Sequence, residues 1–91
     1  MTDIADEMIE SWLVTLPPKT RKSAKSDIRK ALNGVDGDVF GRARTEPVEL
    51  LSELDRNLQT FGRYNGPTRN KIKSVLRRWL RFHGIETLRG G

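Results

Sequence analysis

The residues of this sequence best suited to bind a ligand belong to a basic segment that occurs twice, which we call the repeated phrase. It runs from Thr20 to Leu32 and again from Thr68 to Leu80, so the two copies lie 48 residues apart. Six of the thirteen aligned positions are identical, namely Thr20/Thr68, Arg21/Arg69, Lys25/Lys73, Ser26/Ser74, Arg29/Arg77 and Leu32/Leu80. Lysine and arginine side chains at regular spacing on rigid helices can neutralise successive phosphates of a nucleic acid. The phrase therefore predicts that the chain binds a polyanion.

The charges of the chain are segregated in the same way. Residues 1–16 carry four acidic residues and no basic one, whereas residues 17–34 carry six basic residues against Asp27 alone. Residues 66–91 carry seven basic residues against Glu86, and the whole chain has a net charge of +5. Both basic blocks coincide with the repeated phrase, which is typical of a phosphate-binding surface. The alternative interpretation of each block is an ordinary solvated helix face.

Apolar residues at three- and four-residue spacing predict four helices, at about residues 3–16, 18–33, 47–61 and 67–83. Pro18 and Pro67 fit the first turns of the second and fourth helices, because proline lacks an N–H that would be unpaired there. Residues 34–45 contain three glycines and no helical period, so we expect a connection from which Val39 or Phe40 reaches the core. The predicted fold class is all-α, a single four-helix bundle over residues 1–91 with a short tail.

The cations of the repeated phrase form a stripe on each of two helices. The equivalent stripe positions are Lys22, Lys25 and Arg29 on the second helix and Asn70, Lys73 and Arg77 on the fourth, where Arg81 extends the line. We expect the two helices to offer these stripes together. Thr20 and Thr68 lie in the first turns, where hydroxyl and backbone N–H groups can contact phosphate. Trp12 and Trp79 lie on apolar faces and are expected in the core.

Other kinds of site are not indicated by the sequence. There is no cysteine, and a lone His83 makes neither a metal site nor a proton relay. No phosphate-cradling glycine loop, nucleophile elbow or paired acid and base is present, so we expect no enzyme activity, cofactor, metal or small-molecule substrate. No apolar run approaches the roughly 20 residues that span a bilayer, and the acidic N-terminus is unlike a signal peptide. The expected location is the cytoplasm, with nucleoid association through DNA.

Two motifs resemble a known domain. They are Pro18-x-Thr20-x6-Asp27-Ile28-x2-Ala31-Leu32 and Pro67-Thr68-x-Asn70-x3-Ser74-x-Leu76-x2-Trp79-Leu80, separated by an acidic leucine-rich helix and followed by His83-Gly84-Ile85. Residues 4–85 are in this respect similar to the core-binding domain of tyrosine recombinases, the SAM-like N-terminal domain of phage-integrase-type enzymes. The resemblance implies a four-helix half-clamp around duplex DNA. It places Thr20, Lys22, Lys25 and Arg29 on one DNA-facing helix and Thr68, Asn70, Lys71, Lys73 and Arg77 on the other.

The chain also departs from this family. Ala24 stands where the family commonly has tyrosine, Ala31 where it often has a large aromatic residue, and the loop at 34–45 is long. Residues 1–91 lack the family's catalytic domain, so the chain is expected to bind DNA without cutting it and to act with a linked or separate catalytic domain. Two alternatives stay open, a small all-α protein-interaction domain and a stand-alone DNA-binding accessory protein. A helix-turn-helix regulator is disfavoured, because a whole helix and a long loop separate the basic helices.

Overall fold

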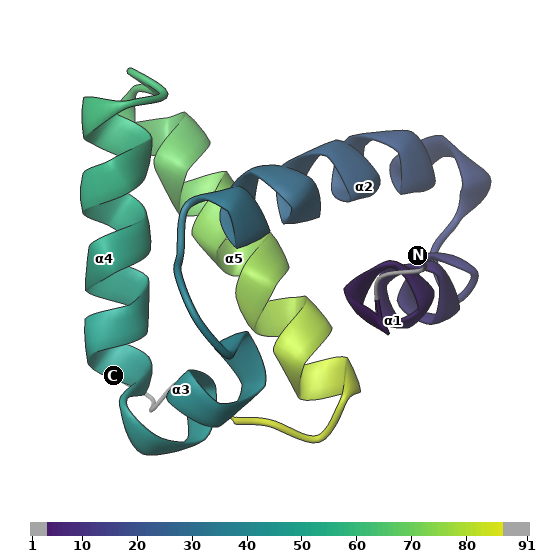
Figure 1. Cartoon of the computed structure of the whole chain (residues 1–91). Helices are drawn as coiled ribbons and strands as arrows, with labels where there is room; N and C mark the ends of the chain where they lie inside the picture. The colour runs from purple at the N-terminus through teal and green to yellow at the C-terminus, as the bar shows by residue number, and fades with distance from the viewer. Residues whose placement is uncertain (1–3, 87–91) are drawn as a thin grey trace.

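The computed structural model describes residues 4–86, which form five helices (Figure 1). In chain order the helices are α1 (Ile4–Leu13), α2 (Pro18–Asn33), α3 (Val39–Thr45), α4 (Pro47–Thr60) and α5 (Gly66–Phe82). Residues 4–86 contain no strand, which confirms the all-α prediction. None of the helices in this part of the chain is long and apolar enough to cross a membrane.

The prediction of four helices was wrong, because the segment expected as a connection contains α3. Seven residues that include a glycine are too few to show a helical period in the sequence. Contacts with other helices hold α3 in place instead. The ring centroid of Phe40 lies 5.1 Å from that of Trp79, and Val39 and Phe40 both pack against the core as expected.

The other helix bounds agree closely with the predicted ones, except at the end of α1. The helix stops at Leu13 rather than at residue 16. The next residues form a tight turn, in which the Thr15 and Leu16 N–H groups donate to the carbonyls of Trp12 and Leu13 at 3.0 and 2.9 Å. The predicted start of this helix at residue 3 and most of the predicted tail lie outside the described residues.

Helix α5 lies at the centre of the fold. It packs against α2, α4 and α1, while α3 packs against α4 (Figure 1). Its buried face consists of Ile72, Val75, Leu76, Trp79 and Leu80. Trp79 is 1% exposed, and its indole N–H donates to the Met8 carbonyl of α1 at 3.2 Å, so burial leaves its polar atom satisfied. Each large apolar side chain buried here contributes about 1.5–3 kcal/mol to stability.

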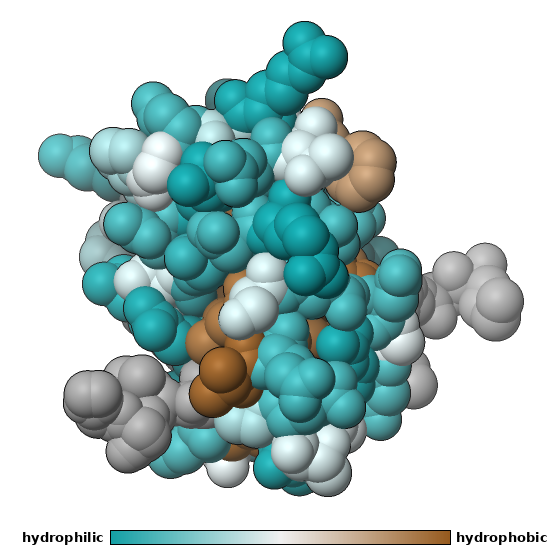
Figure 2. Space-filling model, turned by 90° about the vertical axis from the view of Figure 1, so that its left-hand side faces the viewer, coloured by the Kyte–Doolittle hydropathy of each residue, from teal (hydrophilic) through white to brown (hydrophobic). Residues whose placement is uncertain are grey.

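Two of the four buried residues of helix α2 are alanines, which favours close packing against α5. Ala24 and Ala31 are buried beside Ile28, so the backbone of α2 can lie near α5. At the end of α2, a Cβ added to Gly34 would lie 2.6 Å from Leu54 Cδ1 of α4, so only glycine fits there without displacement of Leu54. On the α4 side the surface is mostly hydrophilic, with a hydrophobic patch near the centre of the view and a separate, paler one at its upper right (Figure 2).

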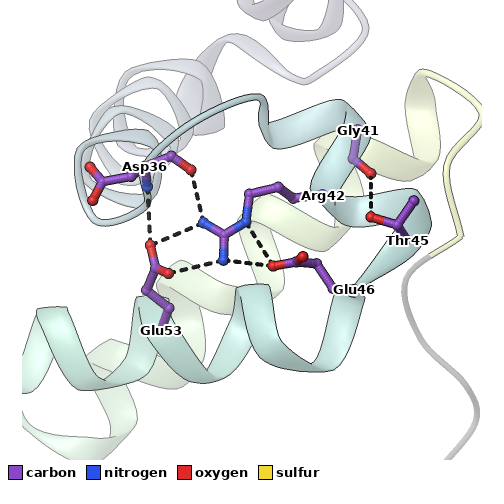
Figure 3. A network of polar contacts seen from close by, with 6 residues as sticks. All are labelled: Asp36, Gly41, Arg42, Thr45, Glu46 and Glu53. Carbon is purple, nitrogen blue, oxygen red and sulfur yellow. Dashed lines mark hydrogen bonds and ion pairs between the residues drawn. The ribbon is translucent and has the colours of Figure 1, made fainter.

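A polar network built on Arg42 fastens α3 to α4 (Figure 3). The guanidinium donates to both oxygens of Glu53, at 2.9 and 3.1 Å, and to Glu46 at 3.0 Å. It also donates to the Asp36 carbonyl at 2.8 Å, while the Asp36 N–H donates to Glu53 at 3.1 Å. The hydrogen bonds from Arg42, and then that from the Asp36 N–H, hold the pKa of Glu53 below its ordinary range. The Arg42 guanidinium thus joins α3 to α4 and to the connection that follows α2.

This network predicts loss of stability in acid. A carboxylate with a lowered folded-state pKa contributes stability that is complete above its unfolded pKa, about 4, and is lost as the pH falls through the folded pKa. The free energy of unfolding should therefore be steady at neutral pH and decline below about pH 4.5. Glu53→Gln should lower the free energy of unfolding already at neutral pH, and this free energy should then fall less steeply as the pH is lowered. Urea unfolding at several pH values measures both effects. The control is Glu49→Gln on the exposed side of α4. Equal stability of the two variants would contradict the role of Glu53.

The central position of α5 predicts a large effect of a core substitution. Leu76→Ala removes a fully buried side chain and should lower the free energy of unfolding by about 2–5 kcal/mol. Val48→Ala, at a position that is 74% exposed on α4, should change it by less than about 0.5 kcal/mol. Denaturant unfolding followed by circular dichroism measures both. Similar losses in the two variants would mean that the packing described for α5 is incorrect.

Candidate nucleic-acid interface

The predicted stripe on α2 faces the acidic helix α1. Lys25 Nζ lies 3.0 Å from a Glu10 carboxylate oxygen, and an Arg29 nitrogen lies 4.0 Å from Asp6. All four side chains are between 42% and 56% exposed, so the pairs are solvent-screened and weak. Lys22 is exposed and has no ion pair within residues 4–86. Helix α1 therefore partly neutralises this stripe.

The predicted stripe on α5 begins on the opposite flank, toward α4. Lys73 Nζ lies 3.0 Å from Asp55 of α4, and the same carboxylate oxygen accepts from Arg69 Nε at 3.1 Å. These hydrogen bonds, that from Lys73 first, hold the pKa of Asp55 below its ordinary range. Lys73 is only 24% exposed. Lys25 and Arg29 of the first stripe thus meet carboxylates of α1, whereas Lys73 of the second meets a carboxylate of α4.

The arginine repeated at the start of both phrases has a structural role in each copy. Arg21 Nε donates to the carbonyls of Leu13 and Leu16, both at 3.0 Å, where α1 ends. Arg69 donates to the Tyr64 carbonyl at 2.7 Å, in the turn before α5. Carbonyls at the end of a helix or in a turn lack helical partners, and the guanidinium supplies donors. Part of the repetition therefore reflects the way each helix is joined to the segment before it.

Thr20 and Thr68, at the starts of α2 and α5, have fewer free groups for a phosphate than expected. The Thr20 N–H donates to the Pro17 carbonyl at 2.9 Å, and the Thr68 N–H donates to the Asn65 side chain, also at 2.9 Å. Asn65 is the N-cap of α5, a role typical of asparagine before a helix that the sequence analysis missed. The predicted backbone contacts to phosphate are therefore already used within the chain, which leaves only the hydroxyl groups.

Helices α2 and α5 meet at a contact that includes Ser23 and Asp27 of α2 and Lys71 of α5, which we call the seam. None of these three residues belongs to the predicted stripes. Lys71 Nζ donates to Ser23 Oγ at 3.2 Å and lies 3.4 Å from Asp27 Oδ2. Ser23 and Lys71 are equivalent positions of the repeated phrase, so the two copies cross where their sequences correspond. Ser74 and Arg78 of α5 lie beside this crossing and line the same surface hollow as Ser23.

One face of α5 remains cationic after these pairs are assigned. At 100° per residue, a sector of about 120° opposite the buried face holds Asn70, Lys71, Ser74, Arg77, Arg78 and Arg81, which we call the α5 outer face. Arg77 and Arg78 have no ion pair with any described residue. Lys71 is 62% exposed, and Arg81 and Glu86, 3.4 Å apart, are 75% and 67% exposed, so solvent screens both cations.

Arg78 was missed by the sequence analysis, which followed the positions that the two copies share. The absence of any acidic residue from Gly66 to Phe82 could have drawn attention to the entire outward side of α5. Residues 4–86 contain no group of three or more histidine, aspartate or glutamate side chains that could hold a metal ion. Comparison of the chain with protein-family models, with curated proteins and with solved structures finds no match.

The pairing of Lys73 predicts that this residue acts in folding. Lys73→Ala should lower the free energy of unfolding by about 1 kcal/mol, because it removes a partly buried ion pair between α4 and α5. The matched control is Arg77→Ala, one turn further along the same helix and without an ion pair in the described residues. Unfolding in urea measures both changes. When Asp55→Asn is already present, Lys73→Ala and Arg77→Ala should lower the free energy of unfolding by equal amounts. A larger loss in Arg77→Ala would contradict the assignment.

Proposed function

We propose that this domain binds duplex DNA through the α5 outer face and the adjoining edge of α2. The observation that carries the proposal is the composition of that face, on which Lys71, Arg77, Arg78 and Arg81 accompany two short polar residues without a carboxylate. Cations on a rigid helix can contact successive phosphates, and each phosphate neutralised releases counterions. Asn70 and Ser74 are short enough to reach base edges between the cations.

The proposal moves the interface relative to the one expected from the sequence. Lys73, which is 24% exposed, pairs with Asp55 of α4 and contributes chiefly to the fold, whereas Lys25 is partly neutralised by its weak pair with Glu10 of α1. Arg29, only 4.0 Å from Asp6, is left at the edge of the surface with Lys22. Arg78 joins the interface. The phosphate-binding surface is thus rotated from the stripes of identical residues toward the seam between α2 and α5.

The wider role that we propose follows the resemblance to recombinase core-binding domains. In this role the domain is the DNA-binding module of a site-specific tyrosine recombinase, gripping the duplex beside the bonds to be exchanged. A linked or separate catalytic domain supplies the chemistry. A half-clamp needs a cationic face on a rigid element, and α5, fixed on three sides by α1, α2 and α4, supplies such an element.

The proposal predicts salt-dependent binding that depends on Arg78. Neutralisation of about two phosphates makes the affinity for any duplex fall about tenfold between about 50 and 200 mM salt. Arg78→Ala should weaken binding severalfold for all sequences and reduce the slope of the logarithmic salt plot by about 1. The measurement is fluorescence anisotropy with a labelled duplex at several salt concentrations.

The matched control is Arg44→Ala, which removes an exposed arginine from α3, a helix that packs on α4 away from the seam. Its affinity and salt slope should equal those of the unmodified protein. Absence of duplex binding at low salt, or equal losses in the two variants, would refute the proposed interface. Capture of an acidic protein by a domain that binds no DNA would favour the protein-interaction alternative.

A further inference from the structure

A second surface hollow lies where the end of α2, the end of α4 and the turn before α5 come together. Lys30 and Asn33 of α2 line it, with Leu58 and Phe61 from the end of α4 and Tyr64 from the turn. We call it the Tyr64 hollow. It shares no lining residue with the hollow at the seam, so it is a separate surface from the one proposed to bind DNA.

Contacts within the domain fix the walls of the Tyr64 hollow. The Asn57 side-chain amide donates to the Gly34 carbonyl at 2.8 Å and so joins α4 to the end of α2. The Tyr64 N–H donates to the Leu58 carbonyl at 3.2 Å, and Lys30 Nζ lies 5.3 Å from the centroid of the Tyr64 ring. A ligand does not have to order these walls when it binds, which lowers the cost of binding.

Phe61 places an uncovered apolar side chain at this hollow. It is 80% exposed, the highest value among the large hydrophobic residues of the part described. Leu58 and Tyr64 extend the apolar surface, and both pack into the core. The volume of the hollow is about 260 Å³, below the roughly 300–1,000 Å³ of pockets that enclose drug-sized ligands. The hollow therefore suits one apolar side chain of a partner, which would also cover Phe61.

The charged residue that lines the hollow and the one in the adjoining turn are both basic. They are Lys30 and the exposed Arg63. No acidic residue lines the hollow, and none occurs in the sequence from residue 56 to residue 85. Glu53 and Asp55, the acidic residues that precede the hollow on α4, already pair with basic residues of the fold. Carboxylates on a partner would complement this surface.

Arg63 has a backbone conformation that glycine adopts more readily. Its φ angle is 55°, in the left-handed region. It directly precedes Tyr64, whose N–H donates to the Leu58 carbonyl where α4 ends, and glycine is the usual residue at such a position. Replacement of Arg63 by glycine therefore removes the cation without weakening the end of α4.

A peptide fits this surface better than a nucleic-acid strand does. Lys30 covers the Tyr64 ring, and a Cβ added to Gly62 would clash with the same ring, so a base would have Phe61 alone to stack on. Two cations are also too few to follow a row of phosphates. The Asn33 side-chain amide makes no hydrogen bond with any described residue, and it carries both the donor and the acceptor that a peptide group requires.

We infer that the Tyr64 hollow binds a short acidic segment of a partner protein. One large apolar side chain of the segment, such as leucine, lies against Phe61, Leu58 and Tyr64. The carboxylates on either side of it lie near Lys30 and Arg63, and the Asn33 amide bonds to a peptide group of the segment. Because the two hollows share no lining residue, this inference does not depend on the proposed DNA binding.

Two labelled peptides test the inference by fluorescence anisotropy. The first has one leucine between two pairs of glutamates, and the second has serine in place of the leucine with every charge retained. The leucine peptide should bind about tenfold or more tightly, because only its leucine can be buried in the hollow. The serine peptide measures attraction by charge alone, including attraction to the α5 outer face. Equal affinities for the two peptides would overturn the inference.

Matched variants locate the site. Phe61→Ser should reduce the preference for the leucine peptide about fivefold or more, whereas Val48→Ser, at another exposed apolar position of α4, should keep it. Arg63→Gly should weaken binding of the leucine peptide severalfold while leaving stability in urea unchanged or higher. Arg44→Ala is its control and should bind as the unmodified protein does. An unchanged preference in Phe61→Ser would contradict the assignment.

Other occupants of the hollow give different results. Self-association of the unmodified protein in sedimentation, lost in Phe61→Ser, would overturn the inference in favour of a second copy of the chain. Binding of a single-stranded oligonucleotide that depends on Phe61 would overturn it in favour of nucleic acid. Arg78→Ala should lose affinity for duplex DNA and keep the preference for the leucine peptide, so the failure of one proposal is distinguishable from the failure of the other.

Discussion

The structure depends on the burial of one face of α5, a helix that carries six cations and no carboxylate. Its neighbours bring carboxylates to the two flanks where its cations come close to the protein, and solvent screens the cations that point outward. Asp55 of α4 supplies a carboxylate on one flank, where it meets Lys73 and Arg69. Asp27 of α2 supplies a second carboxylate on the other flank, beside Lys71. Neutralising the two flanks leaves the positive charge of α5 concentrated on its outer face.

Much of the fold could be predicted from the sequence, since apolar spacing is a local property. The periodicity of Ile72, Leu76 and Trp79 gave the buried face of α5, and the prolines marked where α2 and α5 begin. Helix α3 could not be predicted in this way. Its seven residues are stabilised by Phe40 against Trp79 and by Arg42 against Glu53, and both partners are distant in sequence. Contacts of this kind are invisible to local patterns.

The neighbours of the predicted site residues could not be predicted from the sequence, for a related reason. A helical wheel orders residues around an axis but does not say which neighbour each side meets. Lys25 and Lys73 stood out in the sequence because they are identical in both copies and lie at equivalent positions. Only the packing of α1 and α4 shows that each has a carboxylate within 3.0 Å. Tertiary contacts are therefore needed to decide whether a given lysine or arginine stabilises the fold or is available to a ligand.

The two copies of the basic phrase can now be separated into shared and differing parts. The identical residues Arg21/Arg69 and Lys25/Lys73 contact the element beside each helix in both copies. The positions at the seam differ between the copies: Ser23 corresponds to Lys71, Asp27 to Val75, and Lys30 to Arg78. Lys30 lies over the Tyr64 ring, whereas Arg78 lines the hollow at the seam. Because α2 supplies the Asp27 carboxylate and α5 the cations beside it, the asymmetry of the copies, rather than their likeness, creates the surface to which we assign DNA binding.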